Sequence, residues 1–313
     1  MLRYIWRRLL LMVPVILGLS FILFSIMELT PGDPARAMLG EYAPQEEVEQ
    51  LREQMGLNDP FFVRYWRYVW NALHGDFGVS YRTNIPTVTE IKNRFPATLK
   101  IAFFAVLIAV ILGIPVGIIS AVKQYSAIDI SSMVSALLFT SIPPFWLGLL
   151  MILLFSVKLH ILPAVGSETW KHFIMPAIAM AAAQMATLVR MTRSTMLEVI
   201  RQDYIRTAKA KGAAPARVIF IHSLQNALLP VVTAVGISFS NLLGGALIIE
   251  NVFGISGLGT LMVESVTGKD SPMLISSVLF AALVGGFVNL GVDLLYTFID
   301  PRVKSQYLKR GAK

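Results

Sequence analysis

Six apolar runs, each about as long as a bilayer is thick, constrain this sequence more than any other feature. A spanning helix needs about 20 mostly apolar residues. Lipid offers no hydrogen-bond partner to an open backbone, so each run must be helical. The sequence therefore predicts an all-α, polytopic membrane protein with about six transmembrane helices. The runs cover residues 9–29, 99–122, 130–157, 172–189, 228–249 and 275–299.

The composition agrees with this class. Of the 313 residues, 55% are hydrophobic and 15% are charged, whereas soluble domains carry about 25% charged residues. Cysteine is absent, which excludes disulfides and thiolate metal sites. Many of the basic residues behind the net charge of +8 flank the apolar runs, so we attribute this charge to membrane topology rather than to nucleic-acid binding.

Lysine and arginine also predict the orientation, because they accumulate in short cytoplasmic loops. Basic residues lie before the first run, at Lys123, between the fourth and fifth runs, and in the tail from Arg302 onward. This pattern places both termini of a multi-pass inner-membrane protein in the cytoplasm. We expect residues 1–29 to form a cytoplasmic N-terminus and an uncleaved first span, because the apolar run is too long for a signal peptide. Residues 30–98 then form an extracytoplasmic cap, and 99–313 form the transmembrane core.

The cap residues predict two helices. Pro44 followed by Glu46 and Glu47 is typical of a helix start, and Gly56 of its end. Asn58-Asp59-Pro60 starts a second helix, whose apolar residues recur at helical spacing and include Trp66 and Trp70. Two interpretations stay open for these tryptophans. They either dock a partner outside the membrane or belong to an amphipathic helix in the headgroup region.

Within the spans, a few polar or helix-breaking residues are candidates for lining a path through the membrane. Adjacent prolines in the third run predict a kink or break. Buried amides equally well form hydrogen bonds between helices. The candidates are Pro143, Pro144, Gln184, Asn241 and Asn289.

The loop between the fourth and fifth runs, about residues 190–227, is basic and patterned. Leu197, Ile200 and Tyr204 share a helical face with residues 207 and 208. Gly212 suits a left-handed helix end, and Pro215 suits the first turn of a following helix. The pattern predicts two short helices joined by a tight turn. Small residues around the turn favour close approach by a partner, although an amphipathic connector on anionic membrane lipid is the alternative.

This loop resembles the cytoplasmic loop of permease subunits of ABC importers, in particular the dipeptide, oligopeptide and nickel branch. The resemblance rests on residues 203–212, Asp-Tyr-Ile-Arg-Thr-Ala-Lys-Ala-Lys-Gly, and on four further stretches. The large outer segment after the first span resembles the first, B-type, permease of each pair. The chain departs from the general family at Arg206-Thr207-Ala208, where the family has Glu-Ala-Ala. The further stretches are residues 31–34, 75–80, 250–259 and 300–302.

The resemblance implies a type I importer fold and half of a heterodimeric pore. It implies a second permease subunit, two cytoplasmic ABC ATPases and an extracytoplasmic substrate-binding protein as partners, with ATP and Mg bound by the ATPases and no cofactor in this chain. Short peptides are the expected cargo. The residues expected to couple to an ATPase are Tyr204, Arg206, Thr207, Ala208, Ala210, Lys211, Gly212, Ala213, Ala214, Pro215 and Arg217.

The sequence itself argues against catalysis. It contains no Gly-x4-Gly-Lys-Ser/Thr loop to hold ATP phosphates, and its four histidines lack metal-binding spacing. Gly254-Ile-Ser256-Gly257 lacks the later histidine that an intramembrane serine protease would need. The alternative to an importer permease is a stand-alone ion-coupled carrier, for which Asp293 is the clear carboxylate within a span. We interpret Asp293 as structural.

Overall fold

The computed structural model describes residues 2–30, 32–40 and 42–299, and most of these residues are helical. The chain divides into two compact units. The core unit contains Leu99–Ile255 and the last helix from Gly285, and the cap unit contains Trp6–Thr98 and Ser256–Val284. The α-helices are α1 (Leu2–Leu29), α2 (Pro34–Leu39), α3 (Gln45–Gln54), α4 (Phe61–Leu73), α5 (Thr87–Val122), α6 (Ala127–Ser141), α7 (Pro144–Met151), α8 (Ile174–Ile200), α9 (Asp203–Ala210), α10 (Pro215–Arg217), α11 (Leu224–Gly245), α12 (Leu247–Val252), α13 (Leu258–Thr267) and α14 (Ser271–Ile299).

Three shorter helical stretches join these elements. Two have the wider π-helical winding, Ile152–Lys158 after α7 and Val218–Ser223 after α10. The third is a 3₁₀ turn, Trp170–Phe173, that leads into α8.

Five helices in the described residues are long and apolar enough to cross a membrane, or six if the bent pair of α6 and α7 counts as one span. This confirms the predicted fold class and span count. The predicted break in the third run is also confirmed. α6 ends at Ser141, α7 begins at Pro144, and the chain bends by 96° between them. Proline removes a backbone donor and clashes with the preceding turn, so the pair ends one helix and opens the next.

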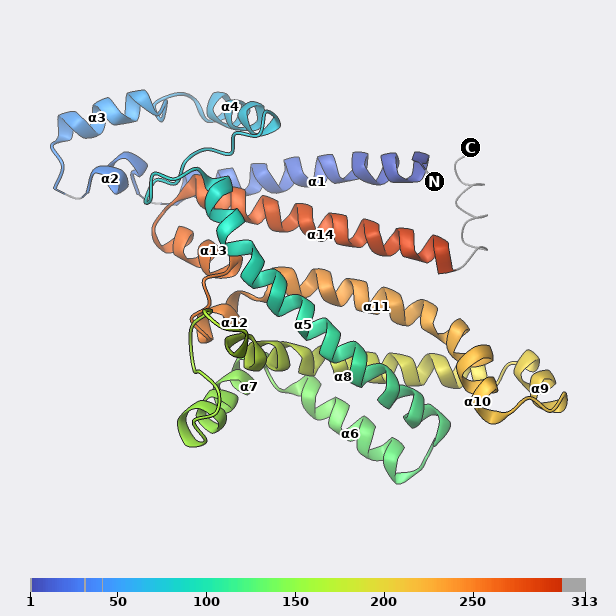
Figure 1. Cartoon of the computed structure of the whole chain (residues 1–313). Helices are drawn as coiled ribbons and strands as arrows, with labels where there is room; N and C mark the ends of the chain where they lie inside the picture. Colours follow the sequence, from blue (N-terminus) through green and yellow to red (C-terminus); the bar gives the residue numbers. More distant parts are fainter. Residues whose placement is uncertain (1, 31, 41, 300–313) are drawn as a thin grey trace. The chain divides into compact units, whose positions relative to one another are not determined.

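In the core unit, α8 is the central helix, with α6 and α11 packed against it (Figure 1). α5 crosses α8 obliquely (Figure 1), and the two helices approach closely at glycines. A Cβ atom at Gly117 would lie 2.6 Å from Thr192 Cβ and 2.8 Å from the Val189 carbonyl oxygen. At Gly113 it would lie 3.1 Å from the Met185 carbonyl oxygen. A larger side chain does not fit at either position, so these two glycines let α5 and α8 pack closely. At Gly244, by contrast, no atom lies within 4 Å of a Cβ position, so close packing is not found there.

An ion pair with a buried carboxylate fixes α8 to the first turn of α6. Arg193 donates from Nε to Asp129 Oδ1 at 2.6 Å and from Nη2 to Oδ2 at 2.8 Å. The Ser120 hydroxyl donates to Asp129 Oδ1 at 2.5 Å, and the Tyr125 backbone N–H donates to Oδ2 at 2.8 Å. Asp129 is thereby buried with each carboxylate oxygen accepting two hydrogen bonds, which is the condition for keeping a charge inside a protein.

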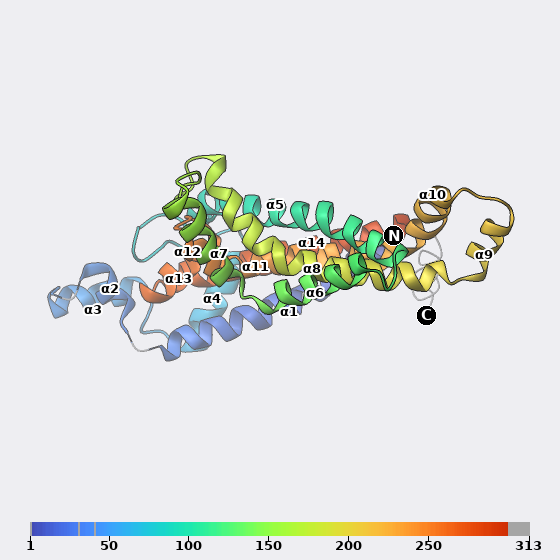
Figure 2. The ribbon, with the colours of Figure 1, turned by 90° about the horizontal axis from the view of Figure 1, so that it is seen from below.

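In the cap unit, α4 packs on α1, and α2 and α3 lie beyond the end of α1 (Figures 1 and 2). The two predicted helix starts are confirmed. Pro44 precedes α3, Gly56 follows it with φ +63°, and Pro60 precedes α4. Glu46 and Glu47 lie in the first turn of α3, where negative charge opposes the helix dipole favourably.

We predict that Gly117→Ala destabilises the protein because the new methyl group meets the Val189 backbone. The strain of overpacking, about 1–3 kcal/mol, exceeds the roughly 1 kcal/mol by which alanine favours a helix over glycine. The matched control is Gly291→Ala, also within a helix but with no atom within 4 Å of the new methyl group. Thermal melting of the purified variants should lower the midpoint for Gly117→Ala alone. Equal midpoints would show that α5 and α8 can separate without cost.

We predict that Asp129→Ala lowers the free energy of unfolding by about 3–5 kcal/mol, because it leaves Arg193 without its partner. The double variant with Arg193→Met should regain part of the loss. Asp203→Ala is the control, since Asp203 forms an ion pair with Arg206 at 3.7 Å in which both side chains are exposed; such pairs contribute little. The midpoints of thermal melting are compared for the single variant, the double variant and the control. An Asp129→Ala variant as stable as the control would contradict a stabilising role for the pair of Asp129 and Arg193.

Candidate functional site

The basic loop folds as a short helix and a turn at the end of the core unit. α8 stops at Ile200, and Gln202 adopts an extended conformation before α9 begins at Asp203. Figures 1 and 2 show α9 and α10 beyond the end of the bundle of α8 and α11. We call residues 203–217 the α9–α10 segment.

Two contacts hold α9 against the bundle. Ile205 is fully buried, while the rest of the helix is exposed or half-buried. The amide Nδ2 of Asn226, in the first turn of α11, donates to the Tyr204 hydroxyl at 3.0 Å. One apolar anchor and one hydrogen bond leave most of the surface of α9 free for another molecule.

The turn after α9 depends on Gly212. Its φ of +79° lies in the left-handed region that glycine adopts without strain. The Gly212 N–H donates to the Lys209 carbonyl at 3.0 Å, and the Ala213 N–H donates to the Ala208 carbonyl at 3.2 Å. Pro215 then occupies the first turn of α10. The predicted left-handed glycine and helix-starting proline are both confirmed.

Two details of the predicted loop are wrong. Leu197 and Ile200 do not share a helix with Tyr204, because the chain breaks at Arg201 and Gln202. The second helix is also not separate, because α10 continues through the π-helical stretch into α11 as one helical span from Pro215 to Gly244. No glycine or proline interrupts residues 216–229, and the helix contains Pro230 without ending there.

All eleven predicted coupling residues belong to the α9–α10 segment because they are neighbours in the sequence, and their coupling role stays a prediction. Only Ala208 and Ala213 are half-buried. The exposed members are Tyr204, Arg206, Thr207, Ala210, Lys211, Gly212, Ala214, Pro215 and Arg217. Small side chains around the turn allow a partner's backbone to approach, and the arginines and lysine around them suit an acidic groove. The α9–α10 segment would transmit force if it were bound by a partner, because its ends join the spanning helices α8 and α11.

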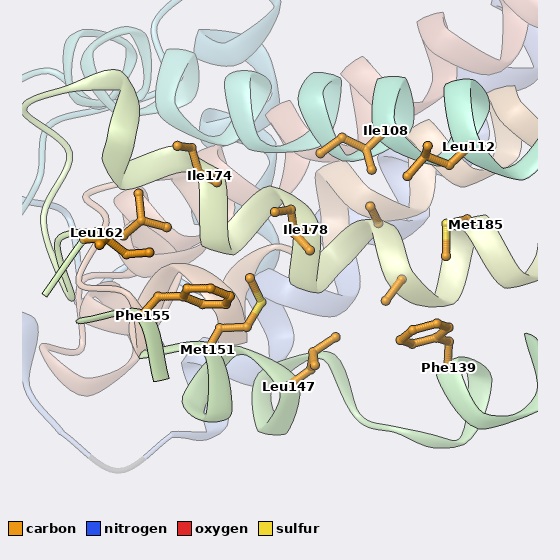
Figure 3. A pocket seen from close by; sticks show the side chains of 13 residues that line it. Ile108, Leu112, Phe139, Leu147, Met151, Phe155, Leu162, Ile174, Ile178 and Met185 are labelled. Atoms are coloured by element: carbon orange, nitrogen blue, oxygen red, sulfur yellow. The ribbon is translucent and has the colours of Figure 1, made fainter. Parts of the chain in front are cut away.

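The predicted path residues differ in their exposure. Pro143, Pro144, Asn241 and Asn289 are exposed, and Gln184 is half-buried. None of them lines the cavity of about 620 Å³ among α5, α6, α7 and α8. Figure 3 shows the side chains that surround this cavity, among them Ile108, Phe139, Leu147 and Ile178, and its lining is almost wholly apolar. The role of the five predicted residues in lining a path through the membrane stays a prediction.

The cap unit holds a second cavity, of about 630 Å³, with a mixed lining. Arg52, Arg64 and Arg67 line it together with Tyr68 and Tyr81. Burial raises the pKa of Tyr68 and of Tyr81 to about 12, so both stay neutral hydroxyls at physiological pH. Trp66 and Trp70, the two candidate docking residues, lie on another face of α4 and are exposed.

The sequence reasoning missed the pair of Asp129 and Arg193. It began the third span at residue 130, whereas α6 begins at Ala127, with Ser126 accepting a capping hydrogen bond from the Asp129 N–H. The capping pattern Ser126-x-x-Asp129 was the available signal. Glu250, at the end of an apolar run, is also fully buried. In the part of the chain that the structure describes, no group of three or more histidine, aspartate or glutamate side chains is arranged to hold a metal ion.

Comparison with known proteins gives full-length relatives. The dipeptide transport system permease protein DppB of Alkalihalophilus pseudofirmus is 42% identical, over 97% of this chain and 100% of its own length. The glutathione transport system permease protein GsiC of Escherichia coli strain K12 is 40% identical, over 97% of this chain and 99% of its own length.

A solved structure and two family models complete the comparison. The MetNI methionine ABC transporter, in an inward-facing form, is similar with a TM-score of 0.57 at 20% identity, over 67% of this chain and 96% of the matched chain, which shows the fold. The model for the N-terminal part of binding-protein-dependent transport system membrane components matches residues 1–102. The model for inner membrane components of these systems matches residues 113–305. The chain therefore belongs to the family of inner membrane components of binding-protein-dependent transport systems.

Proposed function

We propose that this chain is one half of a heterodimeric permease in an ATP-driven importer for dipeptides or other short peptides. The observation that carries the proposal is the exposed α9–α10 segment, which lies between two spanning helices and has most of its surface uncovered. The partners are a second permease, two ATPases that bind ATP and Mg, and an extracytoplasmic binding protein. This chain supplies no catalytic residue, and ATP hydrolysis occurs on the ATPases.

The proposed coupling is mechanical. Each ATPase holds a turn such as Ala210–Pro215 in a surface cleft, and closure of the ATPase pair moves the two permease turns together. Because α9 leaves directly from α8, and α10 is continuous with α11, displacement of the turn tilts both spans. The pore then alternates between inward-open and outward-open states, which are two packings of the same helices.

Short peptides are the cargo class that the relatives favour. One relative is named for dipeptides and the other for glutathione, which is itself a tripeptide. A stand-alone ion-coupled carrier is not favoured by membership of a binding-protein-dependent family. The distribution of basic residues supports a cytoplasmic location for the α9–α10 segment and both termini, on the side where ATPases are found.

We predict that Gly212→Trp leaves membrane insertion intact and abolishes stimulation of ATP hydrolysis by the loaded binding protein. No atom of this chain lies within 4 Å of a Cβ at Gly212, so the indole ring projects from the turn and blocks docking. Gly212→Asn is the matched control, because asparagine tolerates positive φ with a small side chain. Stimulated hydrolysis in reconstituted vesicles is measured. Full stimulation in Gly212→Trp would exclude the turn as the docking point.

We also predict ATP-dependent uptake of a labelled dipeptide by vesicles that contain the full complex, when the binding protein is present. Omission of ATP or of the binding protein should reduce uptake to background. Uptake that continues without ATP and collapses with a proton gradient would instead support a carrier. ATP-dependent uptake of another solute class, with none of di- or tripeptides, would leave the importer intact and overturn the cargo.

A further inference from the structure

α4 carries three distinct faces. At about 100° per residue, Phe61, Tyr65 and Tyr68 fall on one face, Arg64, Arg67 and Asn71 on a second, and a purely apolar group on the third. The third face is the unusual one, because its large side chains are exposed. Its members are Phe62 (73% exposed), Trp66 (66%), Trp70 (57%) and Leu73 (75%).

The first face packs on α1. The Tyr65 ring contacts Phe21 and Phe24 edge-on, with centroids 5.3 and 5.6 Å apart. The Tyr65 hydroxyl donates to the Leu17 carbonyl oxygen at 3.1 Å. Phe61 contacts the same two phenylalanines. α4 is thus held against the apolar surface of a candidate membrane span.

These contacts set the depth of α4. Phe21 and Phe24 precede the end of α1 at Leu29 by a distance along the helix axis of about 8–12 Å at 1.5 Å per residue. Helices that lie in a membrane interface bury their apolar face about 5–10 Å into the boundary between headgroups and acyl chains. α4 therefore crosses α1 at the depth of an interfacial helix, provided that α1 spans the membrane.

The ion pair of Arg64 sets the direction in which the third face points. Arg64 binds Glu28, at the end of α1, through both carboxylate oxygens and so points toward the end of the span. Phe62, Trp66 and Leu73 lie about 160–180° around the helix from Arg64. They therefore point the other way, toward the middle of α1.

The polar face supports the same orientation. Arg64, Arg67 and Asn71 line the 630 Å³ cavity of the cap unit. Arg67 also pairs with Asp59 at 2.5 Å. Charged and amide groups thus occupy a side of α4 that is turned away from the exposed rings.

We propose that α4 is inserted in the membrane interface and that the acyl chains of the leaflet at the Glu28 end of α1 cover Phe62, Trp66, Trp70 and Leu73. Tryptophan prefers this zone of the bilayer. A water-soluble binding protein would meet the polar face of α4 rather than the tryptophan face. The proposal needs α1 to cross the membrane, but it does not depend on the cargo.

Spin labelling tests this directly, because the chain has no cysteine of its own. The full chain, purified with its accompanying subunits and reconstituted in phospholipid vesicles, is labelled at Leu73→Cys and, separately, at Trp66→Cys. Asn71→Cys on the polar face of the same helix is the matched control. The unsubstituted chain, labelled identically, measures the background from accompanying subunits. Collision rates with oxygen, which concentrates in acyl chains, and with a water-soluble nickel chelate are measured by electron paramagnetic resonance.

We expect the labels at positions 66 and 73 to favour oxygen over the nickel chelate by at least several-fold relative to position 71. Addition of saturating binding protein should leave that ratio unchanged. Equal access of the nickel chelate to all three positions would overturn the proposal. Loss of nickel access at positions 66 and 73 only after the binding protein is added would also overturn it, and would assign this face to protein docking. Leu73 is exposed, so its variant should fold even if Trp66→Cys does not.

Discussion

The ion pair of Asp129 and Arg193 is the contact on which the attachment of the α9–α10 segment depends. It ties the first turn of α6 to α8, about two turns before α8 ends and the α9–α10 segment begins. Removing two charges from water is costly, and here the four hydrogen bonds to the carboxylate offset that cost. A segment that transmits force must be attached to a helix that does not slide, and this pair, with the close contact at Gly117, gives α8 such an attachment.

The contacts of α4 with α1 differ in kind from the attachment of α8. They use aromatic rings at membrane depth, whereas the attachment of α8 uses charges and a glycine. The two solutions suit their surroundings. A ring face exposed to acyl chains costs nothing in solvation, while a salt bridge is directional and keeps one register. In both places polar groups find partners within the protein, as hydrocarbon requires: the Tyr65 hydroxyl donates to the Leu17 carbonyl oxygen, and Arg193 donates to Asp129.

The spans, the break in the third run and the turn after α9 could be predicted from the sequence, because the strongest signals in the sequence are local. Runs of apolar residues, the proline pair at 143–144, and the glycine and proline around the α9 turn depend on backbone chemistry that neighbouring residues hardly alter. The errors arose where helical periodicity continues through a break. Leu197, Ile200 and Tyr204 have the spacing of one helix, yet α8 ends at Ile200 and a new helix begins at Asp203. The partners of Asp129 could not be predicted either, since Arg193 is 64 residues away. The direction of the tryptophan face of α4 likewise needed the contacts with α1.

The central claim is that the α9–α10 segment is where an ATPase moves this chain. Site-specific cross-linking tests it most directly, with Ala210→Cys in the cysteine-free chain and single cysteines placed around the surface cleft of the ATPase, in vesicles that contain the whole complex. The account predicts a disulfide-linked adduct of the two subunits that stops ATP-dependent uptake, and recovery of uptake when a reductant cleaves it. An intact, active complex in which Ala210→Cys links to no position on the ATPase, or reacts only with reagents confined to the extracytoplasmic side, would contradict the account.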